Sequence, residues 1–456
     1  MPSRPTSRRR LLAGLALLPA AVACRQQFPD PPKAAAPAAA LLATPTPDEP
    51  RKVRIALPSH DLFRFWATRF QNVNNRLDPA RRVKLTTTPI DVGTTGSEEL
   101  PAVYAQAIAA LPSAEAPDLF MTGPEEISLL PALARGGVAL DLNPVLKSER
   151  WFKMDDFWGN ALRAGQVQGK QAALPISLGA EVILFNRKNF QELGVQPPEG
   201  AWTWEQLIAT AKRLSRRGAG DQPGRWGLYV GPGSPSLLTL AWQHGAQVIS
   251  DDGGHVDMTE PGTLRALELL VDLIDTHKVA PPLDEPAVAA GFGRPWAAMR
   301  RGEIAMWSVF AGGAVWWVGG GTDDLRIAEM PTAEKKVTLG TTPLMLGVPR
   351  NAPDQAHSLN ALRAILDASA ESMFLPPTRN ASDIRKTDNL MAETDATAFA
   401  NTLPMLRFIP GDAPTNVGPA VEHELLRPVL LKQKRPQQAA RDTQRVIDAL
   451  LKKAQG

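Results

Sequence analysis

The amino-acid sequence predicts an α/β protein with room for two domains. Short apolar segments of strand length alternate with helical segments, a pattern typical of βαβ units with parallel strands. The chain has 456 residues, of which 44% are hydrophobic and 21% charged, so it is long and apolar enough to form two cores. A proline- and alanine-rich stretch comes first, so the folded part is expected to begin near residue 51.

The N-terminus carries the features of an export signal. Three arginines at positions 8–10 precede an apolar run at 11–22, and small residues before Cys24 suit a signal peptidase. The run is shorter than the roughly 20 apolar residues that cross a bilayer. Cys24 resembles the acylated cysteine of the bacterial lipoprotein lipobox, and residues 7–12 resemble the twin-arginine export motif. We expect a signal peptide at 1–23 and a lipid on Cys24; an unprocessed leader is the alternative, and the general secretory route stays open.

Residues 24–50 are expected to form a disordered tether. They consist largely of Ala, Pro and Thr and cannot bury enough surface to offset the entropy of ordering. The net charge of the whole chain, +3, is too small to indicate nucleic-acid binding. Cys24 is the only cysteine, and the six histidines lack paired spacing, so we expect no disulfide, no metal site and no cofactor.

Three strands are predicted at the start of the folded part. They span residues 53–57, 83–90 and 116–121, with an amphipathic helix after the first. Ligands of open α/β sheets bind beyond the carboxyl ends of the strands. Residues that follow the first and third strands are therefore candidate ligand contacts: Ser59, Asp61, Thr122 and Glu125.

The middle of the chain carries an ordered series of motifs. They are GKQAALPI at 169–176, EVILFNRKNF at 181–190, WTWEQL at 202–207, MRRGEIAM at 299–306, GVPRNA at 347–352 and LPPTR at 375–379. This order resembles the extracellular solute-binding proteins of ABC importers, a class that includes the maltose- and glycerol-phosphate-binding proteins. The resemblance covers residues 51–456 and rests on the order of the pieces more than on any single piece.

The resemblance implies a two-lobed periplasmic-binding-protein fold, with a ligand cleft between lobes that a multi-segment hinge joins. The implied N-terminal lobe is 51–175 plus 331–371, and the implied C-terminal lobe is 176–330 plus 372–456. Chain crossings are expected near 176–179, 329–332 and 372–378. Such a protein captures a sugar or oligosaccharide and delivers it to ABC permease subunits. We expect an exported cell-envelope lipoprotein, periplasmic or on the outer face of the cytoplasmic membrane. We further expect it to be monomeric, not to be an enzyme and not to bind nucleic acid.

The resemblance also places candidate ligand contacts in the hinge and the cleft. Ser177 and Gly179 fall in the expected hinge strand, where glycine tolerates the backbone change that closure requires. The chain has 11 Trp and 2 Tyr, and indole rings suit stacking on the apolar faces of sugars. Trp242, Trp307, Trp316 and Trp317 fall near segments that face the cleft in the resembled family, and Phe310 is a further candidate contact.

Arg379 is expected at the edge of the cleft, where its guanidinium could bind two ligand hydroxyls or a phosphate. The alternative is a surface arginine paired with Asp383. The sequence also departs from a maltose-type site at two positions: Gly312 replaces a tryptophan, and Gly179 replaces an acidic hinge residue, with Glu181 two positions on. These departures argue against maltose itself and leave the class unchanged.

Several features of the same region have purely structural interpretations. Thr203 and Gln206 form a predicted capping box at the start of a helix. Residues 305–306 are expected in a buried strand, and Trp158 and Trp204 are expected in the core.

Other classes of function are the alternatives. The sequence has no G-x-S-x-G, H-E-x-x-H or Walker motif. Asp251 and Asp252 could imitate the carboxylate pair of a glycoside hydrolase, but adjacent residues on a turn point in different directions. A surface co-receptor that binds carbohydrate without transport is a second alternative, and a binding protein for a polyol or glycerol phosphate is a third.

Overall fold

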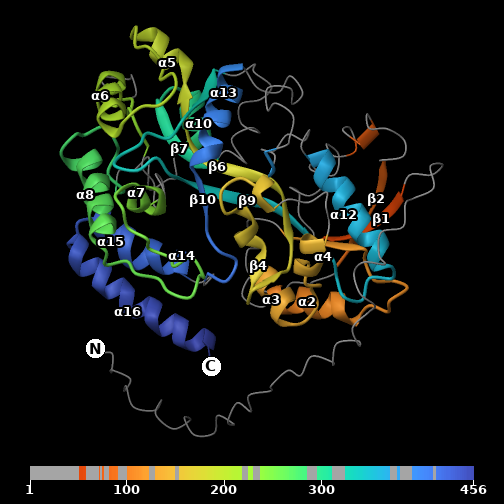
Figure 1. Cartoon of the computed structure of the whole chain (residues 1–456). Helices are drawn as coiled ribbons and strands as arrows, with labels where there is room; N and C mark the ends of the chain where they lie inside the picture. Colours follow the sequence, from red (N-terminus) through yellow and green to blue (C-terminus); the bar gives the residue numbers. More distant parts are fainter. Residues whose placement is uncertain are drawn as a thin grey trace, which may run out of the picture. The chain divides into compact units, whose positions relative to one another are not determined.

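The computed structural model describes residues 51–57, 71, 74–75, 82–90, 100–122, 129–148, 154–217, 224–229, 237–284, 295–310, 324–369, 377–379, 393–413 and 417–455 (Figure 1). All of them belong to the second of two units into which the chain divides, Pro32–Gly456. The predicted signal peptide, Cys24 and the tether lie outside the described residues. Among the described helices, none has the length and apolar character needed to span a bilayer.

A mixed sheet forms the centre of the fold, in the order β2-β1-β3-β9-β6-β7. Its strands are β1 (Arg51–Leu57), β2 (Val83–Pro89), β3 (Leu119–Thr122), β6 (Leu174–Asn186), β7 (Met306–Phe310), β8 (Leu325–Ala328), β9 (Thr338–Gly347) and β10 (Leu406–Phe408). The three strands predicted first are confirmed, although β3 begins three residues later than expected. β1 pairs with β2 and β3 in parallel, as predicted, whereas β9 lies antiparallel between β3 and β6.

Helices and short hairpin strands surround this sheet. The α-helices are α2 (Leu100–Ala110), α3 (Leu129–Arg135), α4 (Asn143–Ser148), α5 (Arg187–Glu192), α6 (Trp204–Leu214), α7 (Leu237–Gln243), α8 (Pro261–Asp275), α10 (Pro295–Arg300), α12 (Gln355–Ser369), α13 (Glu393–Thr402), α14 (Val417–Ala420), α15 (Arg427–Leu430) and α16 (Pro436–Gln455). A π-helical turn, η10 (Val421–Leu426), joins α14 to α15, and 3-10 turns occupy η4 (Met154–Asp156), η5 (Ala161–Gly165) and η9 (Leu403–Met405). β4 (Gln166–Val167) and β5 (Lys170–Gln171) form a separate hairpin.

Helix α6 starts as its sequence predicts. The Thr203 side chain accepts a hydrogen bond from the Gln206 amide, and the Gln206 side chain accepts one from the Thr203 amide. This capping box satisfies two amides that the first helical turn leaves without partners. Trp204, Leu207 and Leu214 then recur at helical spacing and are buried. The predicted buried strand is also confirmed, because Met306 opens β7 and is fully buried.

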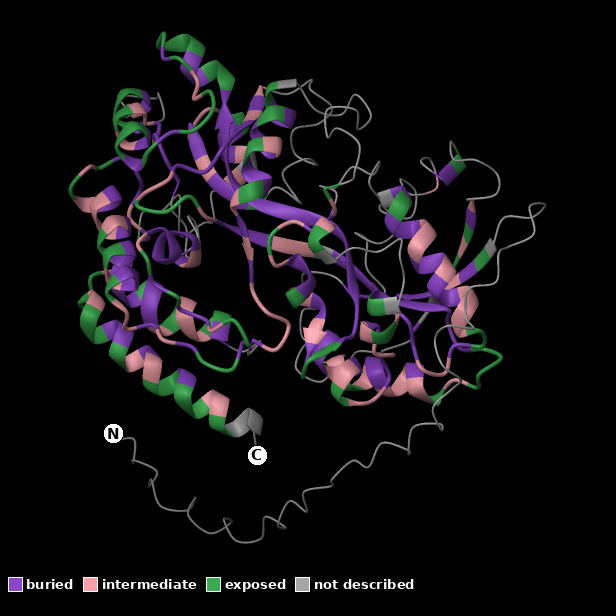
Figure 2. Ribbon diagram, in the orientation of Figure 1, coloured by how far each residue is buried: buried purple, intermediate pink, exposed green. Residues whose placement is uncertain are grey.

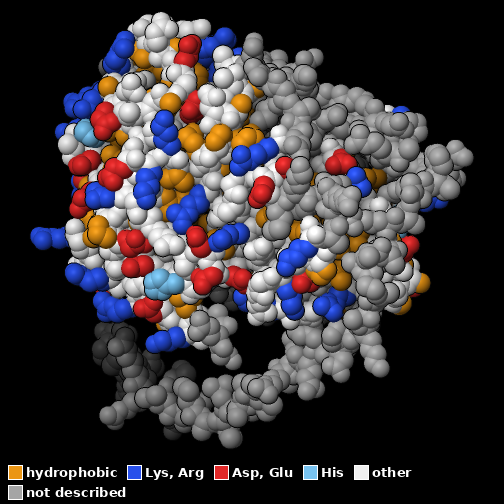
Figure 3. All heavy atoms as spheres, in the orientation of Figure 1, with side chains coloured by type: hydrophobic (Ala, Val, Ile, Leu, Met, Phe, Trp, Pro, Cys, Tyr) orange, Lys and Arg blue, Asp and Glu red, His pale blue; other side chains and the backbone are white. Residues whose placement is uncertain are grey.

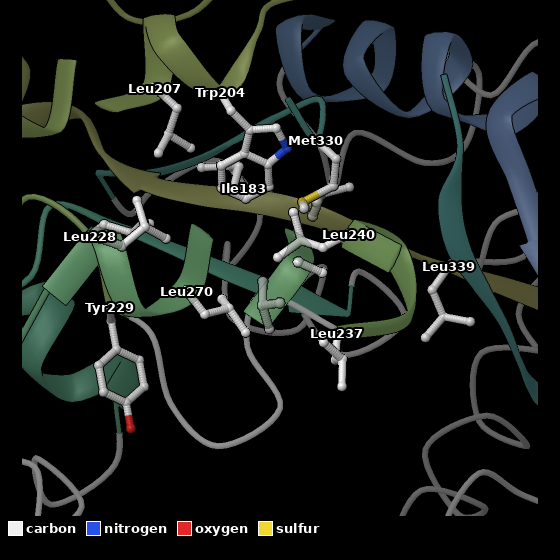
Figure 4. Close-up of a cluster of buried hydrophobic side chains, with 14 of the residues drawn as sticks. Ile183, Trp204, Leu207, Leu228, Tyr229, Leu237, Leu240, Leu270, Met330 and Leu339 are labelled. Carbon is white, nitrogen blue, oxygen red and sulfur yellow. The ribbon is translucent and has the colours of Figure 1, made fainter. Parts of the chain in front are cut away.

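Among the described residues, three clusters of buried apolar side chains form the interior. The large core includes Leu178, Val182, Trp204, Leu240 and Leu270, and Figure 4 shows part of it between α6, α7, α8 and β6. The leucine-rich core includes Leu119, Leu174, Ile176, Leu344 and Leu346. The Tyr104 core includes Tyr104, Phe120, Leu133, Val167 and Met345.

Two neighbouring strands, β6 and β9, contribute to more than one core. In β6, Ile176 belongs to the leucine-rich core and Leu178 to the large core. In β9, Leu339 belongs to the large core and Leu344 to the leucine-rich core. β6 is buried along its whole length, and Figure 2 shows it in the buried colour throughout. In β9, the change from the large core to the leucine-rich core therefore falls between Leu339 and Leu344. This is several residues beyond 329–332, where the resemblance implies a chain crossing.

Candidate functional site

The edge of the sheet where β1 and β3 end brings two predicted contacts close to one strand. The parallel pairing of Ala56 with Phe120 places the ends of β1 and β3 together, and Thr122 closes β3. Thr122 pairs with Met345 of β9, and on the other side of β9 Ser177 pairs with the adjacent residue, Leu344. The two predicted contacts therefore flank a single strand.

Both hydroxyls at this edge are buried without a hydrogen-bond partner among the described residues. Thr122 and Ser177 have side chains that are 0% exposed, and neither Oγ1 of Thr122 nor Oγ of Ser177 makes a hydrogen bond. A buried hydroxyl without a partner costs about 1–3 kcal/mol. Two such groups on opposite sides of one strand mark a place where hydrogen-bonding groups are available inside the protein.

The backbone of β6 is irregular at the same place. Its pairing with β9 shifts register between Pro175 and Ser177 and again between Ser177 and Gly179. Such bulges bend a strand and re-aim its side chains, and they occur often next to functional sites. The irregular stretch coincides with the change from the leucine-rich core at Ile176 to the large core at Leu178.

Glu181 lies two residues beyond this irregular stretch, and it is fully engaged. Its carboxylate accepts hydrogen bonds from the hydroxyls of Ser308 (2.6 Å) and Thr239 (2.5 Å), and its backbone carbonyl accepts one from Thr338. The side chain is 2% exposed. In the sequence, Glu181 was of interest only for its position two residues beyond Gly179. A carboxylate inside a 13-residue apolar strand was a usable signal, because a buried charge requires partners.

The predicted aromatic contacts have different surroundings. Trp242 is 2% exposed; its Nε1 donates to the Gln247 carbonyl, and the guanidinium of Arg407 lies 4.6 Å from its ring centroid. Trp307 is partly buried and meets Tyr229 edge to face at 6.0 Å. Phe310 is 37% exposed at the end of β7, opposite Glu181. Phe310 is therefore the most accessible of the three.

Arg379 is exposed and stacks on an indole. Its guanidinium carbon lies 5.0 Å from the ring centroid of Trp158, a cation–π geometry. Its amide donates to the Asp156 carbonyl, and the Trp158 amide donates to the Pro377 carbonyl, so the two segments pair. Trp158 was expected in the core, and it packs there only in part.

Five predicted contacts, Ser59, Asp61, Glu125, Trp316 and Trp317, lie outside the described residues, as does Asp383, the alternative partner of Arg379. Gly179 lies in β6 and is buried. Within the described ranges, no group of three or more His, Cys, Asp or Glu side chains could hold a metal ion. Lys, Arg, Asp and Glu mix over the described surface in Figure 3, in keeping with the small net charge.

One buried carboxylate away from this edge titrates unusually. Asp395 of α13 is 0% exposed; its Oδ1 accepts from the Ile327 amide of β8, and no described residue hydrogen-bonds its Oδ2. Burial raises its pKa from 3.8 to about 6, against the opposing effects of that hydrogen bond and of Arg326. Burial likewise raises the pKa of the Tyr229 hydroxyl.

Comparisons with known proteins agree with this architecture. The sequence profile described as "Bacterial extracellular solute-binding protein" matches residues 78–362. A protein named as a binding protein in Brucella abortus (strain 2308) is 26% identical over 117 residues, 25% of this chain; the match spans about a quarter (27%) of that relative.

Solved structures share the fold across most of the chain. The cyclic alpha-maltosyl-1,6-maltose binding protein of Arthrobacter globiformis has a TM-score of 0.65 at 16% identity, covering 89% of this chain and 100% of that one. The sugar-binding protein MalE of Xanthomonas citri has a TM-score of 0.66 at 16% identity, covering 89% and 98%. An ABC substrate-binding protein of Listeria monocytogenes, in complex with cycloalternan, has a TM-score of 0.62 at 19% identity, covering 89% and 99%.

Proposed function

The chain belongs to the bacterial extracellular solute-binding protein family, and on that premise we propose that it captures a sugar or oligosaccharide for an ABC importer. Membership implies a protein that works outside the cytoplasm, with a small-molecule ligand and a membrane permease as partners. Proteins of this family bind substrates, and the proposed role requires no bond to break. Sugars are the favoured class because similar structures are described as sugar-binding proteins.

The observation that carries the proposal is the pair of strands shared between cores. A protein that closes around a ligand needs two bodies joined by few covalent connections, and β6 and β9 are suited to that task because each changes core along its length. We propose one lobe around the large core and the other around the two smaller cores. We place the second crossing within β9, between Leu339 and Leu344; of the third proposed crossing, 372–378, residues 372–376 lie outside the described residues.

Thr122 and Ser177 are the proposed hydrogen-bonding contacts. Each hydroxyl both donates and accepts, as each sugar hydroxyl does, and binding would supply a partner that neither has among the described residues. Phe310 and Trp307 are proposed to supply apolar faces for stacking, and Arg379 a cation at the edge of the site. Trp242 is the least suited of the predicted contacts, since the protein itself covers its indole.

Binding energy alone would drive the proposed cycle. An open form admits the sugar, and closure buries it between the lobes. The sugar stabilises the closed form only by its higher affinity for that form, and the permease would then recognise the closed form. The pairing of β6 with β9 is already irregular around Ser177. Bending β6 there during closure would therefore break few regular backbone hydrogen bonds.

A thermal-shift screen tests this function. Cycloalternan, cyclic alpha-maltosyl-1,6-maltose, maltose, a polyol and glycerol phosphate are compared at matched concentrations. A ligand that binds only the folded state raises stability by RT ln(1 + [L]/Kd), about 2.7 kcal/mol at 100 times Kd. Stabilisation by a sugar supports the proposal, stabilisation by glycerol phosphate or the polyol alone moves the site to those solutes, and no shift with any of them counts against it.

The proposed lipid anchor is tested separately. Wild type is expected to partition into detergent, whereas Cys24→Ser is expected to be released as a soluble protein; equal partitioning would rule out lipidation. The co-receptor alternative is tested in strains that lack the permease. If the bound sugar is used equally well without the permease, the protein binds carbohydrate without serving transport. Arg8→Lys with Arg9→Lys is expected to block export only if the twin-arginine route is used.

A further inference from the structure

A stretch near the C-terminus is anchored in the large core and contacts a segment that packs mostly in the two smaller cores. It comprises Leu406–Ala413, and we name it the strap. Leu406, Phe408 and Ala413 belong to the large core, so the strap is fixed to that side. It leaves the sheet after β10, which pairs with the start of β9 at Thr338.

The contacts of the strap are polar and reach segment 160–168. Asn160 and Phe408 exchange two hydrogen bonds, in which the Asn160 amide group donates to the Phe408 carbonyl and the Phe408 amide donates to Asn160 Oδ1. The Gly411 amide donates to the Arg163 carbonyl at 2.9 Å. The Gln168 amide donates to both carboxylate oxygens of Asp412, each at 2.9 Å.

Close packing reinforces these bonds. A Cβ atom on Gly411 would lie 2.5 Å from the Gln166 carbonyl oxygen and 2.6 Å from the Ala164 carbonyl oxygen, so only glycine fits there. Arg163 also donates to the Asp251 carbonyl at 2.8 Å, which adds a second contact to the large-core side. The strap therefore touches backbone along most of η5 and β4.

The segment that the strap contacts packs mostly in the other cores. Ala161 at the start of η5 packs in the large core, but Leu162 packs in the leucine-rich core and Val167 in the Tyr104 core. The Gly411 and Asp412 contacts therefore cross the boundary that β6 and β9 also cross. Any rotation of one side about these strands must stretch, slide or break the Asp412–Gln168 contact.

We propose that the strap is a non-covalent restraint on lobe motion, which sets the balance between open and closed forms without touching the ligand. The proposal rests on the proposed function for the meaning of open and closed, but the restraint itself can be measured without sugar. A restraint that favours one form changes apparent affinity by the ratio of the two populations. Asp412 and Gln168 are positioning residues in this scheme.

Opposite perturbations of the strap test the proposal. The cut variant is Asp412→Ala, and the locked variant is Gln168→Cys with Asp412→Cys in a Cys24→Ser background, which removes the only native cysteine. The direct amide–carboxylate contact brings the two positions close enough to attempt a disulfide. The reduced form of the locked variant is its own control, and Asp442→Ala is the matched control, since Asp442 pairs with Lys434 and Arg445, outside the strap.

The readouts separate this proposal from the proposed function. Without sugar, small-angle scattering is expected to give different radii of gyration for the cut and the oxidised locked forms, and the Asp442→Ala control is expected to match wild type. With maltose and cycloalternan as probes, oxidised and reduced forms are expected to differ in Kd by about tenfold, and the oxidised form should not compact. Identical sugar-free radii in the cut, oxidised and reduced forms would overturn the strap. Failure of wild type to bind any sugar would reject the proposed function and leave the sugar-free comparison intact.

Discussion

The two halves of β6 treat their buried polar groups in opposite ways. In the second half, Glu181 is buried within a regular ladder with β7, and hydroxyls from two other elements satisfy its carboxylate. In the first half, Ser177 is equally buried, its ladder with β9 is irregular, and its hydroxyl has no hydrogen-bond partner in the described part of the chain. One mostly apolar strand thus contains a buried polar group whose hydrogen bonds are satisfied and another whose hydroxyl is not hydrogen-bonded by any described residue.

The difference separates groups that hold the fold from groups that are available to a ligand. A satisfied buried carboxylate contributes to a unique arrangement of α7, β6 and β7, and removing one partner leaves the others uncompensated. An unsatisfied hydroxyl lowers stability slightly, and its cost is recovered when a partner binds. The second half of β6 should therefore govern stability and the first half affinity.

The largest expected effect comes from Trp242, in the same core as the second half of β6. Trp242→Ala is expected to lower the free energy of unfolding by about 3–5 kcal/mol, because it leaves a large cavity. Sugar affinity per folded molecule should change little. Chemical denaturation and calorimetry measure the two quantities, with Phe310→Ala as the exposed aromatic control. A weakened affinity at unchanged stability would return Trp242 to the binding site and break the comparison.

Asp395 is an exception to this comparison. It lies against β8, which pairs with the second half of β6, but only one of its two carboxylate oxygens is hydrogen-bonded by a described residue. Its pKa is about 6 in the folded protein against 3.8 ordinarily, so the folded state holds the proton more tightly. Its stabilising contribution is complete below the ordinary pKa and is lost as pH rises through about 6, costing up to about 3 kcal/mol at neutral pH. Asp395→Asn keeps an acceptor for the Ile327 amide.

The Asn variant should therefore be more stable than wild type at about pH 7.5 and similar to it near pH 4. Denaturation midpoints across that range provide the measurement. A stability difference that does not vary with pH would show that Asp395 keeps its ordinary pKa.

Arg379 tests whether the boundary between the cores carries a ligand contact. Arg379→Ala is expected to weaken sugar binding by about 1.5–3 kcal/mol, roughly ten- to a hundredfold, if its guanidinium hydrogen-bonds the ligand. Stability should hardly change, because the side chain is exposed. Arg379→Lys keeps the charge and loses the forked geometry of the guanidinium, so its sugar affinity should fall between those of wild type and Arg379→Ala. Unchanged affinity in Arg379→Ala would leave the arginine as a surface partner of Trp158.

The smallest effect is expected at Ser177. Ser177→Ala removes an unpaired hydroxyl, so stability should stay the same or rise, while sugar affinity falls by about 0.5–1.5 kcal/mol. Thr122→Val is the matched change on the other side of β9. If both variants lose stability and bind sugar as wild type does, water or the protein satisfies these hydroxyls, and the comparison fails.

Local features were predictable to the extent that neighbouring residues determine them. The capping box at Thr203, the first strands and the buried start of β7 follow from short-range pattern, and the order of motifs identified the family. The partners of Glu181 were not predictable, because Thr239 and Ser308 are 58 and 127 residues away. The burial of Trp242 was not predictable either, because Arg407, whose guanidinium lies over its ring, comes from a distant strand. The chain crossing that the resemblance implies near 329–332 stays a prediction, and core membership changes within β9, between Leu339 and Leu344.

The position of β9 in the sheet has a consequence for biogenesis. This strand lies between β3 and β6 in the sheet, yet it begins at Thr338 and is synthesised long after both of them. Until then the chain has two sheet fragments with open edges and no partner for the stretch around Ser177. Closing the sheet joins segments hundreds of residues apart, a topology of high contact order that folds slowly. Slow closure would leave such a nascent chain unfolded while it is threaded through a translocon, whereas export in the folded state would require it to wait in the cytoplasm with its strand edges protected by chaperones.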